Sequence, residues 1–350
     1  MSYLTELTLK LALGTSHLDE NTRVLHCAWL QAQQHADGGF AGREGNSDPY
    51  YTAFGLRGLL IVDGIDANVA QRASAFIRSQ LDAKLGVVDL ISLIMAASIL
   101  EFAAGGDEMS AMRAAGDRIA GTLLSLRSAD GGYAKTPGGA AGSTYQTFLN
   151  LLCWELIGRE EPEPDRVVNF LQSQRQMDGG FREIRVAKRA GVNPTAAGIG
   201  SLKALGRLEL EKESATAEFL GEMQTSEGGL AANDRIPMPD LLSSCTGLIS
   251  LIDLESVERI DVGKLLRYAR TMERRQLPTK VVGEPSAVQA MMFDWDNDDD
   301  AETPDGSKAI NPRDTLPGGF HGFEFDEDVD VEYTFYGLAC LTLGELCLSG

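Results

Sequence analysis

The residues best suited to bind a metal cation form a run of carboxylates from Asp294 to Asp305. Aspartates alternate with other residues at positions 294, 296, 298 and 300, and Asp299 and Glu302 add further carboxylates. Carboxylate oxygens are the ligands that hard cations such as Mg²⁺ and Ca²⁺ prefer, so this spacing suits coordination of either ion. Dense like charge in a polar segment equally fits a solvated acidic loop, and the sequence leaves both interpretations open.

Positive charge gathers in a different stretch. Arg182, Arg185, Lys188 and Arg189 lie within eight residues of an otherwise acidic chain, and Arg235 is the nearest cation in the next loop. Phosphates bind well where such side chains lie beside helix N-termini, because free N–H groups and the helix dipole favour negative charge. The alternative is a solvated loop that balances acidic neighbours.

An internal repeat places these residues. An aromatic–Leu pair, a Gln and Asp-Gly-Gly-Phe occupy residues 29–40, and the same frame recurs at residues 170–181 with every offset preserved. Weaker copies of the frame occur elsewhere, so the positions equivalent to Asp37 are 37, 84, 130, 178, 227 and 276. They recur with a period of 46–49 residues. A constant period of this size indicates stacked units, none of which buries its apolar face alone.

Each unit is typical of two helices joined by a glycine turn. Apolar residues at helical spacing run up to the turn, where glycines permit positive φ and end the first helix. A second, more apolar stretch follows, as at residues 48–56, 240–248 and 330–338, each led by an aspartate that can cap a helix. Six such pairs predict a closed helical ring with the more apolar helices inside.

The sixth unit departs from this period. Its turn is expected near Gln276, but Gly318-Gly319 follows 42 residues later. We therefore expect one domain over residues 1–350, with an acidic insertion at residues 277–317 where the other units need only a turn.

Composition and charge narrow the class of protein. Hydrophobic residues make up 43% of the chain, and no apolar run approaches the ~18 residues that span a bilayer. The stretch from Leu4 to Leu13 is interrupted by Glu6 and Lys10 and lacks a basic leader, which speaks against a signal peptide. Five cysteines in apolar contexts indicate reduced thiols in a cytoplasmic protein. The net charge of −20 argues against nucleic acid and anionic membranes as partners.

Aromatic side chains recur at equivalent places in the second helices. They are Tyr50, Tyr51, Phe54, Tyr145, Phe148, Tyr333, Phe335 and Tyr336. Rings at helical spacing are usually core residues. In a closed ring, however, matching positions face one axis, where aromatic faces suit a polyisoprene chain or a carbocation.

The repeat resembles that of protein prenyltransferase β-subunits and squalene or hopene cyclases. The resemblance rests on the Gln-x3-Asp-Gly-Gly-Phe frame followed by Tyr-x-Thr and Gly-Leu, over residues 20–347. It implies an all-α (α/α)6 toroid with a central apolar cavity for an isoprenoid or similar lipid. The length resembles a lone prenyltransferase β-subunit, which implies an isoprenoid diphosphate at the basic rim and, as partner, an α-subunit-like protein or a second copy of the chain.

The resemblance also bears on catalysis. It places the family's zinc ligands at the positions of Asp240, Leu242 and Tyr333, of which only the aspartate is retained, so we expect no zinc. Cys245 and His321 leave a rearranged site as the alternative. The candidate catalytic residues of this region are Asp240, Asp330 and Tyr333.

A second catalytic interpretation concerns Asp296, Asp298 and Asp299. They fit the Asp-x-Asp-Asp signature with which class II terpene cyclases protonate an alkene or epoxide. There, neighbouring groups and a dry cavity hold the central carboxyl protonated. Three hypotheses stay open: a prenyltransferase-like enzyme, a non-catalytic lipid-binding or scaffold toroid, and a class II terpene cyclase-like enzyme.

Overall fold

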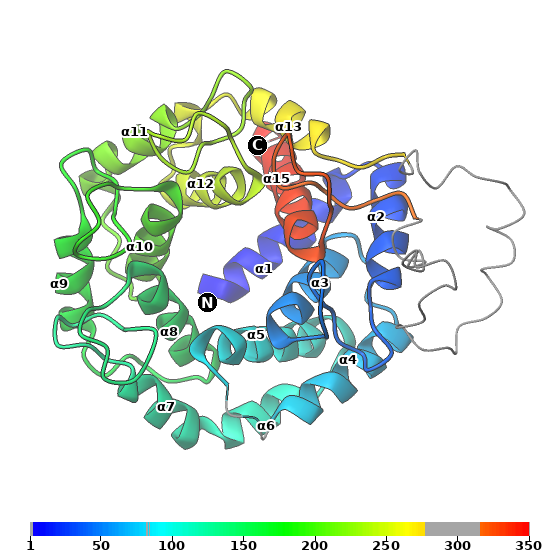
Figure 1. Cartoon of the computed structure of the whole chain (residues 1–350), viewed down its shortest axis with the longest axis horizontal. Coiled ribbons are helices and arrows are strands. Elements are labelled where there is room, and N and C mark those ends of the chain that lie inside the picture. Colours follow the sequence, from blue (N-terminus) through cyan, green and yellow to red (C-terminus); the bar gives the residue numbers. More distant parts are fainter. Residues whose placement is uncertain (1–2, 82, 84, 277–315, 350) are drawn as a thin grey trace, which may run out of the picture.

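The structure is a computed structural model that describes residues 3–81, 83, 85–276 and 316–349. Fourteen α-helices occur in these ranges, together with isolated β-bridges but no strand. Seen down its axis, the chain forms two concentric layers of helices (Figure 1). The predicted all-α (α/α)6 toroid is confirmed.

Six helices form the inner layer. They are α3 (Pro49–Ile61), α5 (Val87–Ala104), α8 (Thr144–Leu156), α10 (Val192–Ala204), α12 (Leu241–Asp253) and α15 (Val331–Ser349). Each packs against the next along the chain, and α15 packs against α3. This last contact closes the ring.

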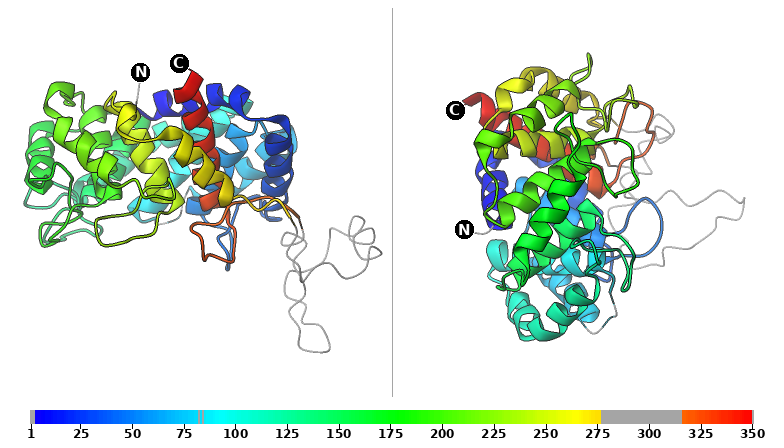
Figure 2. Two further views of the ribbon diagram at one scale, coloured as in Figure 1. Left: turned by 90° about the horizontal axis from the view of Figure 1, so that it is seen from above. Right: turned by 90° about the vertical axis from the view of Figure 1, so that its left-hand side faces the viewer.

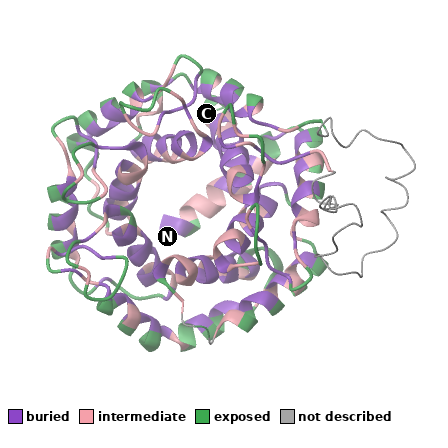
Figure 3. Ribbon diagram, in the orientation of Figure 1, coloured by how far each residue is buried: buried purple, intermediate pink, exposed green. Residues whose placement is uncertain are grey.

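The outer layer holds the first helix of each repeat. Its members are α2 (Glu20–Ala32), α4 (Ala67–Gln80), α6 (Glu108–Ala114), α7 (Gly116–Ser125), α9 (Pro164–Gln174), α11 (Ser214–Glu222) and α13 (Val262–Thr271). In the third repeat the outer helix is divided at Ala115 into α6 and α7. The buried residues lie mainly on the inner helices and on the faces of the outer helices that cover them (Figure 3).

The glycine turns hold one repeat against the next. Gly38 has φ +90°, and a Cβ at this position would lie 2.0 Å from the carbonyl oxygen of Arg72 on the next outer helix. Gly318 closes the ring in the same way: its φ is +125°, and a Cβ there would lie 2.6 Å from the Cβ of Trp29 on α2. Only glycine permits both the backbone conformation and the close approach.

Helix α1 (Tyr3–Gly14) has no counterpart in the repeat. It crosses the opening of the ring at the C-terminal ends of the inner helices (Figures 1 and 2). The backbone N–H of Leu4 donates to Glu155 at the end of α8, and Thr15, which follows α1, donates to the carbonyl of Ile61 at the end of α3. One mouth of the toroid is therefore crossed by a helix, while the loops after the glycine turns surround the other.

Helix α5 alone among the described helices is long and apolar enough to cross a membrane by length and composition. Half of its residues are buried, and it packs between α3 and α8. Both facts are typical of a core helix.

The predicted insertion at residues 277–317 lies outside the described residues, apart from Leu316 and Pro317. Asp296, Asp298, Asp299 and the whole Asp294–Asp305 run fall in the part that is not described. Their predicted roles in acid catalysis and in binding Mg²⁺ or Ca²⁺ therefore stay predictions.

Candidate functional site

Neighbouring inner helices bring part of the predicted aromatic set together. On α3, the ring centroids of Tyr50 and Phe54 lie 4.9 Å apart, and Phe54 lies 5.4 Å from Tyr336 and 5.5 Å from Phe335 on α15. Tyr51 packs against Tyr50 and Tyr333 against Tyr336, both edge to face. We call these six side chains the aromatic cluster; they meet because closure of the ring sets the first inner helix beside the last.

The two aromatic residues of α8 lie elsewhere. Phe148 packs edge to face against Tyr3 of α1, with ring centroids 5.9 Å apart. Tyr145 is 39% exposed and makes no ring contact within the described residues. The predicted belt of aromatic rings is therefore concentrated on α3 and α15.

A carboxyl group lies within the aromatic cluster. The hydroxyl of Tyr50 donates to Oε1 of Glu332 at 2.7 Å, and that of Tyr336 donates to the same oxygen at 3.4 Å. Burial raises the pKa of Glu332 above its ordinary value, against the opposing effect of the Tyr50 hydrogen bond, and the charge of Asp330 adds to the rise. A carboxyl in this setting tends to hold a proton, which is the property that a general acid requires.

The second charged residue of this region is Arg57 on α3. Its Cζ lies 3.7 Å from the ring centroid of Phe335 and 5.5 Å from that of Phe54. The guanidinium forms no hydrogen bond or ion pair with any described residue. Burial lowers its pKa, and its side chain, of intermediate exposure, lines a cavity between α1, α3 and α5.

Sequence reasoning missed Glu332 and Arg57, although a signal was present. Arg57 is the one charged residue of α3, a helix that is otherwise apolar or neutral. Glu332 is the second residue of α15, an apolar helix whose one other charged residue, Glu345, lies near its end. A charge within an apolar core helix points to a polar interior site, because such charges are rare unless a partner or ligand holds them.

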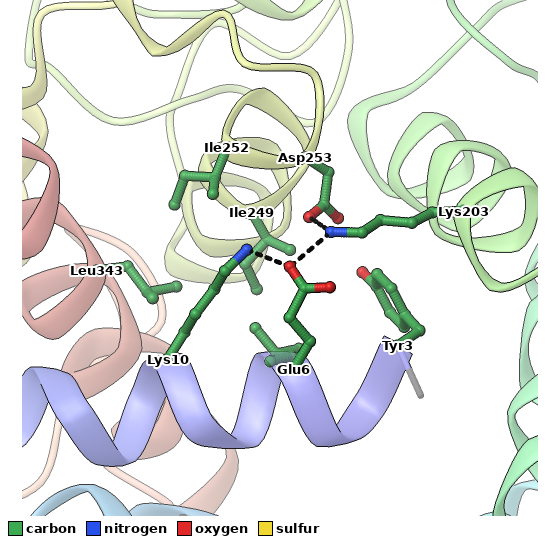
Figure 4. A pocket seen from close by; sticks show the side chains of 9 residues that line it. Tyr3, Glu6, Lys10, Lys203, Ile249, Ile252, Asp253 and Leu343 are labelled. Atoms are coloured by element: carbon green, nitrogen blue, oxygen red, sulfur yellow. Dashed lines mark hydrogen bonds and ion pairs between the residues drawn. The ribbon is translucent and has the colours of Figure 1, made fainter. Parts of the chain in front are cut away.

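The closed mouth holds a separate charged group, shown in Figure 4. Nζ of Lys203 on α10 lies 3.0 Å from Glu6 of α1 and 2.7 Å from Asp253 of α12, and Glu6 also pairs with Lys10 at 2.7 Å. These contacts tie α1 to two inner helices. Because each of these charges is paired, we interpret the group as a structural contact that holds α1 in place rather than as a ligand-binding site.

The predicted phosphate-binding residues divide into two sets. Arg182 donates to the carbonyl of Ser173 and to the side chain of Gln174, and Arg189 forms an ion pair with Asp234 in the next loop. The other set is exposed and has no side-chain partner among the described residues. Its members are Arg185, Lys188 and Arg235.

The three candidate catalytic residues lie at the N-termini of two inner helices, α12 and α15. Asp240 caps α12, accepting from the backbone N–H of Ser243 at 2.6 Å and from its hydroxyl at 2.8 Å. Asp330 caps α15, accepting from the backbone N–H of Tyr333 at 2.8 Å. Burial raises the pKa of Asp240, and burial together with the charge of Asp240 raises the pKa of Tyr333 to about 12. The caps are confirmed; a catalytic role for these residues is untested.

The proposed alternative metal ligands differ in environment. Cys245 is buried beside Cys340, whereas Nδ1 of His321 lies 3.2 Å from the carbonyl oxygen of Asp328 in a surface loop. The described ranges contain no group of three or more metal-ligating side chains. The expected absence of zinc stays a prediction.

Comparison with known proteins gives one family. The sequence matches the family described as "Prenyltransferase alpha-alpha toroid domain" over residues 12–341. No curated protein sequence matches the chain.

Solved structures share the fold at low sequence identity. Candida albicans protein geranylgeranyltransferase-I complexed with GGPP superposes with a TM-score of 0.57 and 16% identity, over 84% of this chain and 83% of that chain. A variant of the type II terpene cyclase MstE from Scytonema, in complex with geranylgeranyl dihydroxybenzoate, gives 0.54 and 13% over 98% and 99%. A protein from Actinoplanes gives 0.51 and 14% over 95% and 100%. At these identities the likeness shows the fold alone.

Proposed function

Since this chain belongs to the prenyltransferase alpha-alpha toroid family, we propose that it binds an isoprenoid or similar lipid inside its ring of inner helices. The observation that carries the proposal is the aromatic cluster, in which Tyr50, Phe54 and Tyr336 lie within 5.4 Å of one another in successive pairs. Aromatic faces suit the electron-rich, branched chain of an isoprenoid and any cation formed on it. Two solved structures of this fold carry isoprenoid ligands, GGPP and geranylgeranyl dihydroxybenzoate.

A diphosphate on this lipid would bind at the rim where the inner helices begin. Arg185, Lys188 and Arg235 are three cations there that are exposed and have no side-chain partner among the described residues. Their loops precede the N-termini of α10 and α12, where the helix dipoles also favour negative charge. On this basis we favour a prenyltransferase-like transfer activity in the cytoplasm. The active species would be a single chain, a dimer of this chain, or a complex with an α-subunit-like partner.

A second candidate activity is proton-initiated cyclisation, and Glu332 favours it. Its protonated carboxyl would transfer the proton to one carbon of a polyene double bond, leaving a tertiary cation on the other carbon. Attack by further double bonds would form rings, and loss of a proton from the final cation would return the proton that Glu332 gave. Tyr50, Phe54 and Tyr336 would stabilise the cations through their ring faces.

Native mass spectrometry with farnesyl and geranylgeranyl diphosphate tests binding directly. We expect a one-to-one complex with wild type that is weakened in a Phe54→Ala variant, because that change removes the ring that joins the two halves of the cluster. Ile184→Ala, at a side chain exposed on the rim, is the matched control. Absence of any complex with either diphosphate, or with the corresponding alcohols, would refute lipid binding.

Product analysis separates the two activities. After incubation with geranylgeranyl diphosphate and removal of the phosphates by a phosphatase, gas chromatography–mass spectrometry should show cyclised alcohols, derived from cyclised diphosphates, only if a group such as Glu332 acts as an acid. Glu332→Gln should then abolish the products while preserving the complex seen by native mass spectrometry. Products that persist in this variant would assign the proton to another group.

A further inference from the structure

The cavity between α1, α3 and α5 combines an apolar wall with one cation. Its volume is about 220 Å³, and its lining includes Leu4, Leu7, Leu60, Met95 and Ile99 together with Arg57. Thr5, Thr8 and Ser98 add hydroxyl groups to this lining. An apolar cavity of about 150 Å³ already admits a benzene-sized guest, so this space is large enough for several carbon units of a lipid chain. The cavity extends to the half-exposed side chain of Phe102 near the closed mouth.

The contacts of Arg57 define how a ligand can reach it. Phe335 covers one face of the guanidinium at 3.7 Å, a stacking distance that leaves the N–H groups directed outward in the guanidinium plane. None of them meets an acceptor within the described residues. The Arg57 side chain keeps intermediate exposure where it lines the cavity. Two coplanar oxygens placed there would pair best with its outward N–H groups.

The charge of the cavity selects among anions that offer two oxygens. Arg57 is the one cation in its lining, and the one carboxylate there, Glu101, is paired with Arg113 at 3.0 Å. The nearby cation Lys203 is not available to a ligand either, because it is paired with Glu6 and Asp253. One guanidinium balances a single negative charge, whereas a diphosphate would bring further charges that nothing here neutralises.

We propose that this cavity binds the carboxylate of a lipid, with Arg57 as its counter-ion and the apolar chain against α1 and α5. The ligand class is a monoanionic prenyl or fatty carboxylic acid, or a prenylated carboxylic acid. This inference rests on the proposed lipid-binding function and specifies the head group. It also assigns different anions to the two ends of the ring: carboxylate at Arg57 and phosphate at the exposed rim.

Isothermal titration calorimetry at neutral pH with farnesoic acid and farnesol provides the test, because the two probes share one chain and differ in the head group. Wild type should bind the acid at least about tenfold more tightly, the effect expected for one charge-assisted fork. Arg57→Met should abolish this preference and leave the affinity for farnesol within about threefold, since methionine keeps the apolar stem. Arg207→Met, which removes an exposed cation 3.6 Å from Asp165, should leave both affinities unchanged.

Two outcomes overturn the inference. One is equal affinity of wild type for the acid and the alcohol; the other is a preference that survives in Arg57→Met. Arg57→Lys covers the event that the methionine variant fails to fold, because it keeps the charge but loses the fork and should reduce the preference without abolishing it. If farnesol binds and farnesoic acid gains nothing, only the head-group inference fails. If no isoprenoid probe binds, the proposed function fails as well.

Discussion

Nε2 of His26 lies 3.0 Å from Oε1 of Glu273, and both side chains are completely buried although 247 residues separate them. The backbone N–H of Gly319 donates to Nδ1 of the same imidazole at 3.1 Å, so Nε2 carries the proton and donates to Glu273. His26 also stacks on Phe320, with ring centroids 4.8 Å apart. One neutral histidine of α2 therefore joins the first repeat to the last in the outer layer.

This pair predicts a loss of stability on mild acidification. Burial lowers the pKa of His26 in the folded protein, whereas the unfolded imidazole titrates at about pH 6.5. Below about pH 6.5 the unfolded state thus binds the extra proton, and the free energy of unfolding falls as the pH decreases towards the folded pKa. Urea unfolding between pH 5 and pH 8 should show this decline, and a flatter profile is expected for His26→Gln. His17→Gln, at an exposed site, should keep the wild-type profile.

Glu273 extends the effect to lower pH. Burial alone would raise its pKa, but hydrogen bonds from His26 and Arg275 outweigh burial and hold the pKa below the ordinary value. Its contribution is therefore present above about pH 4.3 and is lost as the pH falls through the folded pKa. Stability that is flat between about pH 6.5 and pH 5 in wild type would contradict a neutral, buried His26.

The rim is closed by a second long-range contact, which Arg43→Ala should disrupt. Its guanidinium donates to both oxygens of Asp326 at 2.7 and 2.6 Å and to Asp330 at 2.8 Å. Both carboxylates are largely buried, so their isolation should lower the free energy of unfolding by about 2 kcal/mol. Arg166→Ala breaks an exposed pair with Glu163 and should cost less than about 0.5 kcal/mol. Chemical denaturation measures both, and equal costs would show that the Arg43 contact is an ordinary surface pair.

Asp240 offers a test that separates capping from catalysis. Asp240→Ala should lower the free energy of unfolding by about 1 kcal/mol, because the N–H of Ser243 loses its acceptor. Asp240→Asn preserves the cap and should cost only a few tenths of a kcal/mol. A stable Asp240→Asn variant that binds lipid but has lost turnover would show that the carboxylate also acts in catalysis.

Protein purified without added metal should contain much less than one zinc ion per chain. Leu242 offers no donor, and the phenol of Tyr333 keeps its proton because its pKa is raised to about 12. Elemental analysis by mass spectrometry measures the content. Stoichiometric zinc that is lost in Cys245→Ala or His321→Ala would reveal the rearranged site.

The parts of this fold that could be predicted are those that repeat. The Gly-Gly turns and the capping aspartates Asp240 and Asp330 can be predicted because their local conformations follow from short sequence motifs. Helix α1 lies outside the repeat and has no equivalent in it. Its position across the ring is therefore known only from its tertiary contacts. In the sequence its Glu6 and Lys10 only interrupt an apolar run, whereas in the structure they lie one helical turn apart and pair at 2.7 Å.

The site was harder to predict than the fold, because it depends on which face of each inner helix points to the axis. Arg57 and Glu332 gain their properties from burial among side chains of other repeats. Among the rim cations, only the structure shows that Arg189 is paired with Asp234 in the following repeat while Arg185 is not paired. A local charge pattern cannot distinguish these environments.

The hold of α1 on the ring should depend on Lys203. Asp253 is almost fully buried, and burial already raises the pKa of its carboxyl although the Lys203 ammonium lowers it. In a Lys203→Met variant that pKa should rise further and the carboxyl should take up a proton, while Glu6 keeps only its contact with Lys10. The ion pairs through which Lys203 joins α1 to α10 and α12 are then lost, but the packing of the inner helices on one another is not.

Amide hydrogen exchange resolved by segment measures this effect. Lys203→Met should accelerate exchange in α1 by at least about tenfold, equivalent to about 1.4 kcal/mol of local opening free energy, and leave α12 and α15 protected. Lys212→Met, which removes an exposed pair with Glu209, should change neither region. Unchanged exchange in α1 would mean that its apolar contacts alone hold it across the ring. Faster exchange throughout the inner layer would mean instead that α1 is part of the core that stabilises the toroid.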